Sequence, residues 1–302
     1  MTEHAAGEPE KKATKGAGRH YDHVLVSISN PETADQLVKL ACRLTDTSTV
    51  LHIMSVTTSA PFPDRAEQWR ESSQLVMDMT HLANRLGRVA KPMAVTARSI
   101  PDAIIGRAKD IDAGLIIMGW FGRVTPIAVR KSRVVNRVLH EADCDTAVLK
   151  YRGDITDVNR LILPAGGGVN EARLQFAKSF LWQWPVKTSL VHVMPPDSDR
   201  SREEVEERLS RAAEQLGPGS TTRILQDDNV VRGIVNLAEE TDLILVGPGR
   251  EWVFNRFLFG RNADQITNEA PGPVLMFKAR EKKLSAWLRG LIKYLAGSIT
   301  QQ

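Results

Sequence analysis

The sequence predicts an α/β fold, in which two tandem domains are each a doubly wound parallel sheet and a C-terminal basic amphipathic helix follows. Two observations predict the sheets. Short continuous apolar runs, typical of strands buried on both faces, alternate along the 302 residues with longer segments of helical periodicity. The same order of elements also occurs twice, in residues 21–152 and in residues 157–279. Connections between parallel strands are right-handed, so each sheet is expected to carry helices on both faces.

The first half begins with an apolar run at residues 23–29, which is expected to form a buried strand. A helix over residues 32–44 follows, because Ala34, Leu37 and Val38 lie on one helical face. Ser99 and Asp102 then place a hydroxyl and a carboxylate at the start of a later helix. The other elements predicted here are strands at residues 50–56, 93–97, 114–118 and 146–150 and helices at 64–86 and from Ser132–Arg133 to residue 141.

The second half repeats this order after a short polar linker at about residues 152–159. A short linker leaves the two halves little freedom, so they are expected to pair with each other within the chain. The elements predicted for this half are strands at residues 160–164, 189–194, 222–225, 242–246 and 273–277 and helices at 170–180, at 201–216 and from residue 227.

Charge and composition narrow the classes of partner. The net charge is +4, but the residues from Lys278 onward carry six basic side chains and one acidic one, which leaves the rest of the chain at −1. A nucleic-acid-binding domain is expected to carry its basic residues on the folded domain, so nucleic acid is not expected as a partner. Residues 1–20 lack an apolar stretch and are expected to be a disordered lead. No apolar run approaches the roughly 20 residues that span a bilayer.

A glycine-bearing segment follows the predicted strand at residues 114–118. Gly119 and Gly122 come directly after the strand, and Ser132 and Arg133 stand at the expected start of the next helix. Glycines allow close backbone approach, and a helix N-terminus offers free amides to an anion. In an open parallel sheet, ligands bind at the carboxyl ends of the strands where the strand order reverses. The spacing therefore predicts a phosphate site at this end of the sheet.

This spacing resembles the signature G-x2-G-x9-G-(S/T) of the universal stress protein family, which has a Rossmann-like fold. In that family the glycines and the hydroxyl cradle a nucleotide triphosphate, so the resemblance implies ATP or another adenine nucleotide as ligand. The residues that it assigns to nucleotide binding are Ser29, Asn30, Ile53, Met118, Gly119, Gly122, Ser132, Arg133 and Val134 in the first half and Gly166, Gly167, Gly168, Gly247, Gly260, Arg261 and Asn262 in the second.

Both halves depart from the family pattern. Arg133 and Arg261 stand where the hydroxyl is expected, and Arg250 replaces the second glycine of the second half. The aspartate that the family's nucleotide binders often carry after the first strand is Ser29 in one half and Gly166 in the other. An arginine at the helix start can pair with a phosphate or can fill the site itself, and the sequence leaves both readings open.

The run Gly166–Gly168 has two interpretations. It can be a tight strand-to-helix turn that needs positive φ. It also resembles universal stress protein domains appended to the cytoplasmic ends of membrane transporters, among them amino-acid permeases and cation/proton antiporters. Residues 30–34, 259–260 and 273–276 and the basic tail fit the same subgroup.

The tail, residues 281–300, predicts an amphipathic helix. Its apolar stripe consists of Leu284, Trp287, Leu288, Leu291, Ile292 and Leu295, and the basic residues Lys282, Lys283, Arg289 and Lys293 flank it. Such a helix can bind an anionic membrane surface or a membrane transporter. It can equally pack on the second domain or across a homodimer. Both alternatives stay open at this stage.

No catalytic or metal motif stands out. His52 and His192 lie inside apolar strands without carboxylate or thiol neighbours at ligand spacing, so they are interpreted as structural histidines. Cys42 and Cys144 are expected to be packed thiols. We expect a cytoplasmic regulatory protein, not an enzyme, that binds an adenine nucleotide and modulates a partner; the resemblance leaves weak ATP hydrolysis open. The alternative is a scaffold without a nucleotide that docks on a transporter through its tail.

Overall fold

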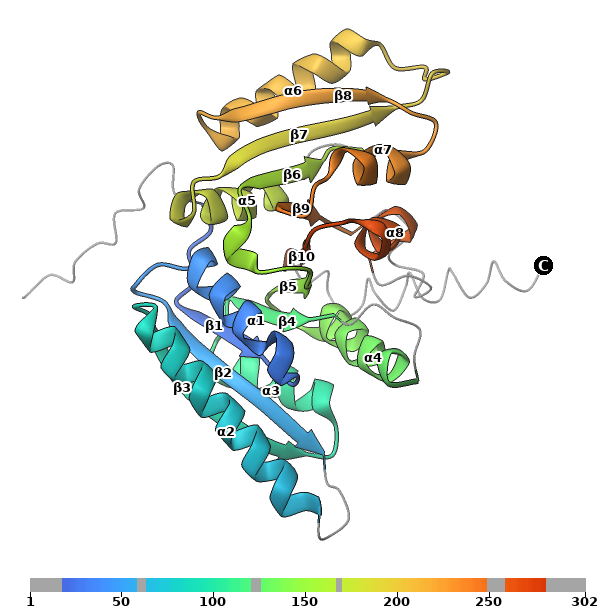
Figure 1. The fold of residues 1–302 in the computed structure, drawn as a ribbon. Coiled ribbons are helices and arrows are strands. Elements are labelled where there is room, and N and C mark those ends of the chain that lie inside the picture. Colours follow the sequence, from blue (N-terminus) through green and yellow to red (C-terminus); the bar gives the residue numbers. More distant parts are fainter. Residues whose placement is uncertain (1–17, 59–63, 121–125, 167–169, 249–258, 281–302) are drawn as a thin grey trace, which may run out of the picture.

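The computed structural model describes residues 18–58, 64–120, 126–166, 170–248 and 259–280, and of residues 64–65 and 126–132 only the backbone. Within these ranges it contains ten strands and eight α-helices in the order that the sequence predicts (Figure 1). The elements of the first half are β1 His23–Ser27, α1 Pro31–Leu44, β2 Val50–Thr58, α2 Asp64–Arg85, β3 Val89–Ala97, α3 Ile100–Asp110, β4 Leu115–Gly119, α4 Pro126–Glu141 and β5 Asp145–Lys150.

A short 3-10 turn, η1 Ile155–Asp157, lies in the linker to the second half. It is held against the first half, because the Ile155 amide donates to Gln36 Oε1 at 2.7 Å. The elements of the second half are β6 Arg160–Pro164, α5 Glu171–Gln183, β7 Lys187–Met194, α6 Arg202–Leu216, β8 Ser220–Gln226, α7 Val230–Leu237, β9 Asp242–Val246, α8 Arg261–Glu269 and β10 Val274–Lys278.

All ten strands join in one sheet with the order β3-β2-β1-β4-β5-β10-β9-β6-β7-β8. Neighbours within each half are parallel, and the two halves meet through the antiparallel pair β5 and β10, where Leu149 lies opposite Leu275. Figure 1 shows this pair in the middle of the molecule and β3 and β8 at its two ends. The expected pairing of the halves within one chain is therefore present.

The apolar cores on the two faces of the sheet both continue across this junction. One core lies under α1, α2, α5 and α6 and includes Leu149 and Leu275. The other lies under α3, α4, α7 and α8 and includes Val148 and Met276. Alternate residues of one strand point to opposite faces, so β5 and β10 each contribute to both cores. Neither half buries its last strand without the other.

Helix α4 corrects one prediction. It begins at Pro126, whereas the sequence analysis placed the start of this helix at Ser132–Arg133. Proline is favoured at the first helical position, because the N–H that it lacks would have no partner there, and residues 127–131 contain no helix breaker. The amides of residues 132 and 133 therefore lie inside the helix and bond to preceding carbonyls, so they are not free to hold an anion.

The strand ends correct three smaller predictions. Strands β3 and β8 are longer than predicted, because they are edge strands whose exposed, polar residues hide the apolar pattern. Strand β1 stops at Ser27, so Ser29 lies in the loop after it. Lys278, counted with the tail above, is the last residue of β10; it is buried, and its Nζ donates to the Leu139 carbonyl at 2.6 Å. The rest of the tail and residues 1–17 lie outside the described residues, and no described helix is long and apolar enough to cross a bilayer.

His52 and His192 are buried, as are both cysteines of the chain, in agreement with their structural interpretation. His52 Nε2 lies 3.3 Å from His23 Nδ1, and His192 Nδ1 lies 3.1 Å from the Ala165 carbonyl oxygen. Burial raises the pKa of the Cys42 thiol to about 11 and that of Cys144 to about 12, so neither is a reactive thiolate at neutral pH. In the part of the chain that the structure describes, no group of three His, Cys, Asp or Glu side chains could hold a metal ion.

His52 makes the stability depend on pH. Burial, and after it the charges of His23, Lys91 and Arg107, lower the pKa of His52 to about 4. An unfolded histidine titrates near 6.5, so between about pH 6.5 and 4 the unfolded chain binds a proton that the folded chain does not. We expect the free energy of unfolding to fall by about 2–3 kcal/mol over this window on account of His52. Urea titrations at several pH values should show that the free energy of unfolding depends less steeply on pH in this window for His52→Gln than for the wild-type chain. An unchanged pH dependence would contradict the assignment.

Candidate functional site

The strand order reverses at two places in the sheet, between β1 and β4 and between β6 and β9. We call the carboxyl ends of β1 and β4, with Ser29, Asn30, Met118 and Gly119, the first switch point. The carboxyl ends of β6 and β9 lie at the corresponding place in the other half, and we call them, with Gly166 and Gly247, the second switch point. In the first, Ser27 is in register with Met118; in the second, Ile162 is in register with Ile244. The fold thus brings together residues far apart in the sequence at the edge where parallel sheets bind ligands.

Most side chains of the first switch point are buried or already form hydrogen bonds within the protein. Asn30 caps α1, and its Oδ1 accepts a hydrogen bond from the Glu32 amide at 3.2 Å. Met118 is buried, whereas Ser29 is exposed. A Cβ on Gly119 would lie 3.5 Å from Leu37 Cδ1, which is an ordinary contact. Among the described residues, therefore, no close neighbour requires glycine at this position.

Several predicted nucleotide contacts lie apart from this point. Ile53 is completely buried in the core beneath α1 and α2. Arg133 is exposed on α4, and Val134 beside it packs against the core on the other face. Gly122, Gly167 and Gly168 and the side chain of Ser132 lie outside the described residues, as do Lys282, Lys283, Leu284, Trp287, Leu288, Arg289, Leu291 and Lys293 of the tail.

The second half keeps the helix start that the sequence predicts. Helix α8 begins at Arg261, and Gly260 precedes it with φ 108°, a conformation that favours glycine. The Asp264 carboxylate accepts a hydrogen bond from the Phe259 amide at 2.9 Å and so holds this turn. Arg261 and Asn262 are exposed on the first turn of the helix.

Arg173 also lies at the second switch point, and sequence reasoning missed it. It belongs to the first turn of α5, and its Nη2 donates to the Pro164 carbonyl at the end of β6 at 2.7 Å. Its side chain also lies against the end of β9, since a Cβ on Gly247 would be 3.6 Å from Arg173 Cδ. Burial lowers the pKa of the guanidinium to about 10, so it stays charged at neutral pH. The signal in the sequence was a basic residue in the first turn of a helix, where the helix dipole disfavours a cation.

The comparisons with known proteins identify the family. The model of the universal stress protein family matches residues 20–150 and 181–278. The chain belongs to this family. Its fold is similar to that of a universal stress protein from Archaeoglobus fulgidus, with a TM-score of 0.63, 14% identity and coverage of 86% of this chain and 97% of that one.

Two further similarities of this universal stress protein are to transport proteins. Its fold resembles the cytoplasmic domain of a prokaryotic cation chloride cotransporter, with a TM-score of 0.61, 10% identity and coverage of 88% of this chain and 98% of that one. Its sequence is 21% identical over 266 residues to the Na(+)/H(+) antiporter NhaS5 of Synechocystis sp.. That match covers 84% of this chain and 38% of the antiporter, so the chain spans well under half the length of this relative.

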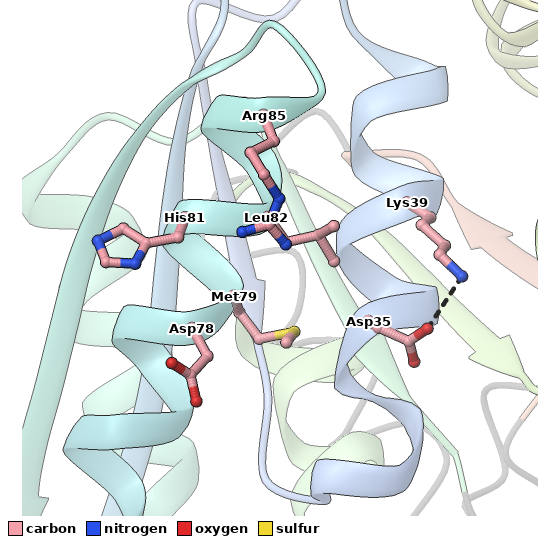
Figure 2. Close-up of a pocket in the computed structure, with 7 residues that line it drawn as sticks. All are labelled: Asp35, Lys39, Asp78, Met79, His81, Leu82 and Arg85. Carbon is pink, nitrogen blue, oxygen red and sulfur yellow. Dashed lines mark ion pairs between the residues drawn. The ribbon is translucent and has the colours of Figure 1, made fainter.

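A cavity of about 400 Å³ lies elsewhere, between α1 and α2 (Figure 2). Its lining residues are Asp35, Lys39, Asp78, Met79, His81, Leu82 and Arg85. Lys39 Nζ is already paired with Asp35 at 3.0 Å and with Asp154 at 2.7 Å. Arg85 and His81 also lie in this lining, but its two carboxylates and its already paired lysine make it a poor fit for a phosphate group. We therefore place the candidate site of this family member at the switch points, where glycines end the strands.

Proposed function

We propose that this universal stress protein is a cytoplasmic regulatory module of a membrane cation transporter. The observation that carries the proposal is the similarity to the Na(+)/H(+) antiporter, which extends over 84% of the chain and so includes both halves. The fold shared with the cytoplasmic domain of the cation chloride cotransporter supports the same partner class. The basic tail at residues 281–300 would then dock on the transporter or on the anionic inner surface of its membrane.

The signal that the module senses is, in our proposal, an adenine nucleotide at the first switch point. Gly119 supports this, because among the described residues a side chain added there would meet only Leu37, at an ordinary contact distance. Ser29 lies at the same edge and is exposed, so its hydroxyl is accessible to a ligand. Nucleotide binding here would alter contacts of the loops after β1 and β4, and through them the contact with the transporter.

The alternative function is a scaffold that binds no nucleotide. Two observations favour it. The amides of residues 132 and 133, which the family signature would use for phosphate, lie within α4. At the second switch point, the Arg173 side chain extends across the ends of β6 and β9, with Cδ at ordinary contact distance from a Cβ on Gly247 and Nη2 donating to the Pro164 carbonyl.

Calorimetric titration with ATP, ADP and AMP separates the two functions. We expect binding by the wild-type chain and at least about a tenfold loss of affinity in Gly119→Val, whose side chain would enter the ligand's space. Gly247→Val is the matched control at the other switch point and should keep the affinity. No heat with any nucleotide, on freshly purified protein without a retained ligand, would favour the scaffold. Equal binding by Gly119→Val and wild type would remove the first switch point as the site.

A further inference from the structure

The cavity between α1 and α2 contains part of an apolar row that the fold leaves only partly covered. Leu75, Met79 and Leu82 of α2, with Leu86 directly after it, recur at i, i+4, i+7 and i+11 along one side of the helix. The first three are partly buried against the core, and Leu86 is 44% exposed. Figure 2 shows Met79 and Leu82 extending from α2 toward α1. We call the cavity with this row the α1–α2 groove.

The corresponding helix of the second half has no such exposed row. The apolar residues of α6 are Val205, Leu209 and Ala212, which are buried, and Ala213 and Leu216, which are partly buried. Helix α2 buries a similar row and carries the groove residues in addition to it. Packing against the sheet therefore does not account for the second apolar row of α2.

Acidic side chains flank the groove. Glu67, Glu71 and Asp78 recur at i, i+4 and i+11, and each is exposed on the side of α2 next to the apolar row. Lys39 of α1 also lines the groove, but two carboxylates already neutralise it. Arg85 lies at the C-terminal end of α2, so acidic groups border the rest of the row. A basic amphipathic helix would match both the apolar row and its flank.

The described chain ends close to one end of this groove. The Arg280 amide donates to the Asp145 carboxylate at 2.6 Å, and the Tyr21 hydroxyl donates to the same carboxylate at 2.8 Å. Thr49, in the loop after α1, donates to the Tyr21 carbonyl at 2.8 Å. Arg88, just after α2, bonds to carbonyls at the end of α1. The tail therefore leaves the described structure on the side where α1 and α2 both end.

We infer that the α1–α2 groove holds the chain's own C-terminal tail, residues 281–300. In this arrangement Leu288, Leu291 and Leu295, at i, i+3 and i+7, pack on the apolar row of α2. Arg289 and Lys293 face its acidic flank. Residues 281–287 can bridge about 25 Å when extended, at roughly 3.3–3.6 Å per residue. The inference goes beyond the proposed function, because it needs no transporter and gives the tail a second position in the free protein.

The test is hydrogen exchange of the full chain, measured by mass spectrometry in buffer without lipid or transporter. In the wild-type chain we expect the amides of residues 284–295 to exchange at least about tenfold more slowly than in Met79→Gln, which puts a polar side chain of similar length in the groove. Met77→Gln is the matched control and should leave this exchange unchanged. Met77 belongs to the same helix and is 41% exposed, but it lies on the opposite side.

The charges of the groove give a second pair of variants. Asp78→Lys should also speed the exchange of the tail, because it replaces an acidic flank residue by one that repels Arg289 and Lys293. Asp110→Lys makes the same change at an exposed position of α3, away from the groove, and should have no effect on the tail.

A change in the tail tests the same contact from the other side. Leu291→Gln alters no described residue, so it leaves the described fold intact. We expect hydrogen peroxide to oxidise Met79 faster in this variant than in wild type, because the tail no longer covers it. The oxidation rate of Met77 in the same samples should not change.

Two results would overturn the inference: equal exchange of the tail in wild type and Met79→Gln, or equal oxidation of Met79 in wild type and Leu291→Gln. Protection of the tail that rises with protein concentration would also overturn it, because the groove would then hold the tail of a second copy. None of these results bears on transporter regulation, since no transporter is present in the experiment.

Discussion

Replacement of Phe277 by alanine should lower the free energy of unfolding by about 3–5 kcal/mol, the usual cost of removing a fully buried phenylalanine. Phe277 is 2% exposed, and its ring stacks on Phe176 of α5 with centroids 4.0 Å apart and an interplanar angle of 12°. It lies in β10, which joins the two halves. Urea titrations followed by circular dichroism and by tryptophan fluorescence would measure the loss.

The same experiment tests whether the halves unfold together. Both apolar cores run across the junction, so the variant and the wild-type chain should each show one transition with the same midpoint by both methods. Trp182→Ala is the control, since it also removes an aromatic ring from α5 but one that is 67% exposed; its effect should stay within about 0.5 kcal/mol. Two separate transitions, or a Phe277→Ala effect as small as that of the control, would contradict the shared core.

Replacement of Asp145 by alanine should cost a similar amount, about 3–5 kcal/mol, because it leaves a part-buried arginine and a buried hydroxyl without their acceptor. Asp145 opens β5 and is 2% exposed. Its carboxylate accepts from the Tyr21 hydroxyl at 2.8 Å and from the Arg280 amide at 2.6 Å, and it pairs with the Arg19 guanidinium. Burial, and then the nearby carboxylate, raise the pKa of Tyr21, so the hydroxyl remains a donor.

The loss at Asp145 can be assigned by a matched pair and a double-mutant cycle. Asp102 pairs with Arg137 on the surface, where solvent screens the charges, so Asp102→Ala should change stability little. Combining Asp145→Ala with Tyr21→Phe should cost less than the sum of the two single changes, because both remove the same hydrogen bond. Additive effects, or equal losses for Asp102 and Asp145, would show that this carboxylate does not tie the ends of the described chain to β5.

The sequence was most informative where a segment is buried on both faces. Central strands such as β4 and β9 follow directly from apolar runs, and the repeated order of elements predicts two parallel sheets. Edge strand β3 was only half visible, because residues such as Lys91 and Pro92 interrupt its apolar pattern without preventing an edge strand from forming. The start of α4 was misplaced for a related reason. A family spacing suggested Ser132, whereas the local preference of Pro126 for a first helical position gives the observed start.

The family, the doubly wound fold of each half and the glycines that end β4 and β9 could be predicted from the sequence, because they follow from local patterns and from the order in which those patterns repeat. The folded structure was needed to see that β5 and β10 join the halves into one sheet, and that the Arg173 side chain reaches the ends of β6 and β9. A charged side chain becomes energetically costly only once packing has removed water from around it, so the sequence alone does not show which charges will carry this cost. Burial is a property of the whole fold, and no local pattern in the chain contains it.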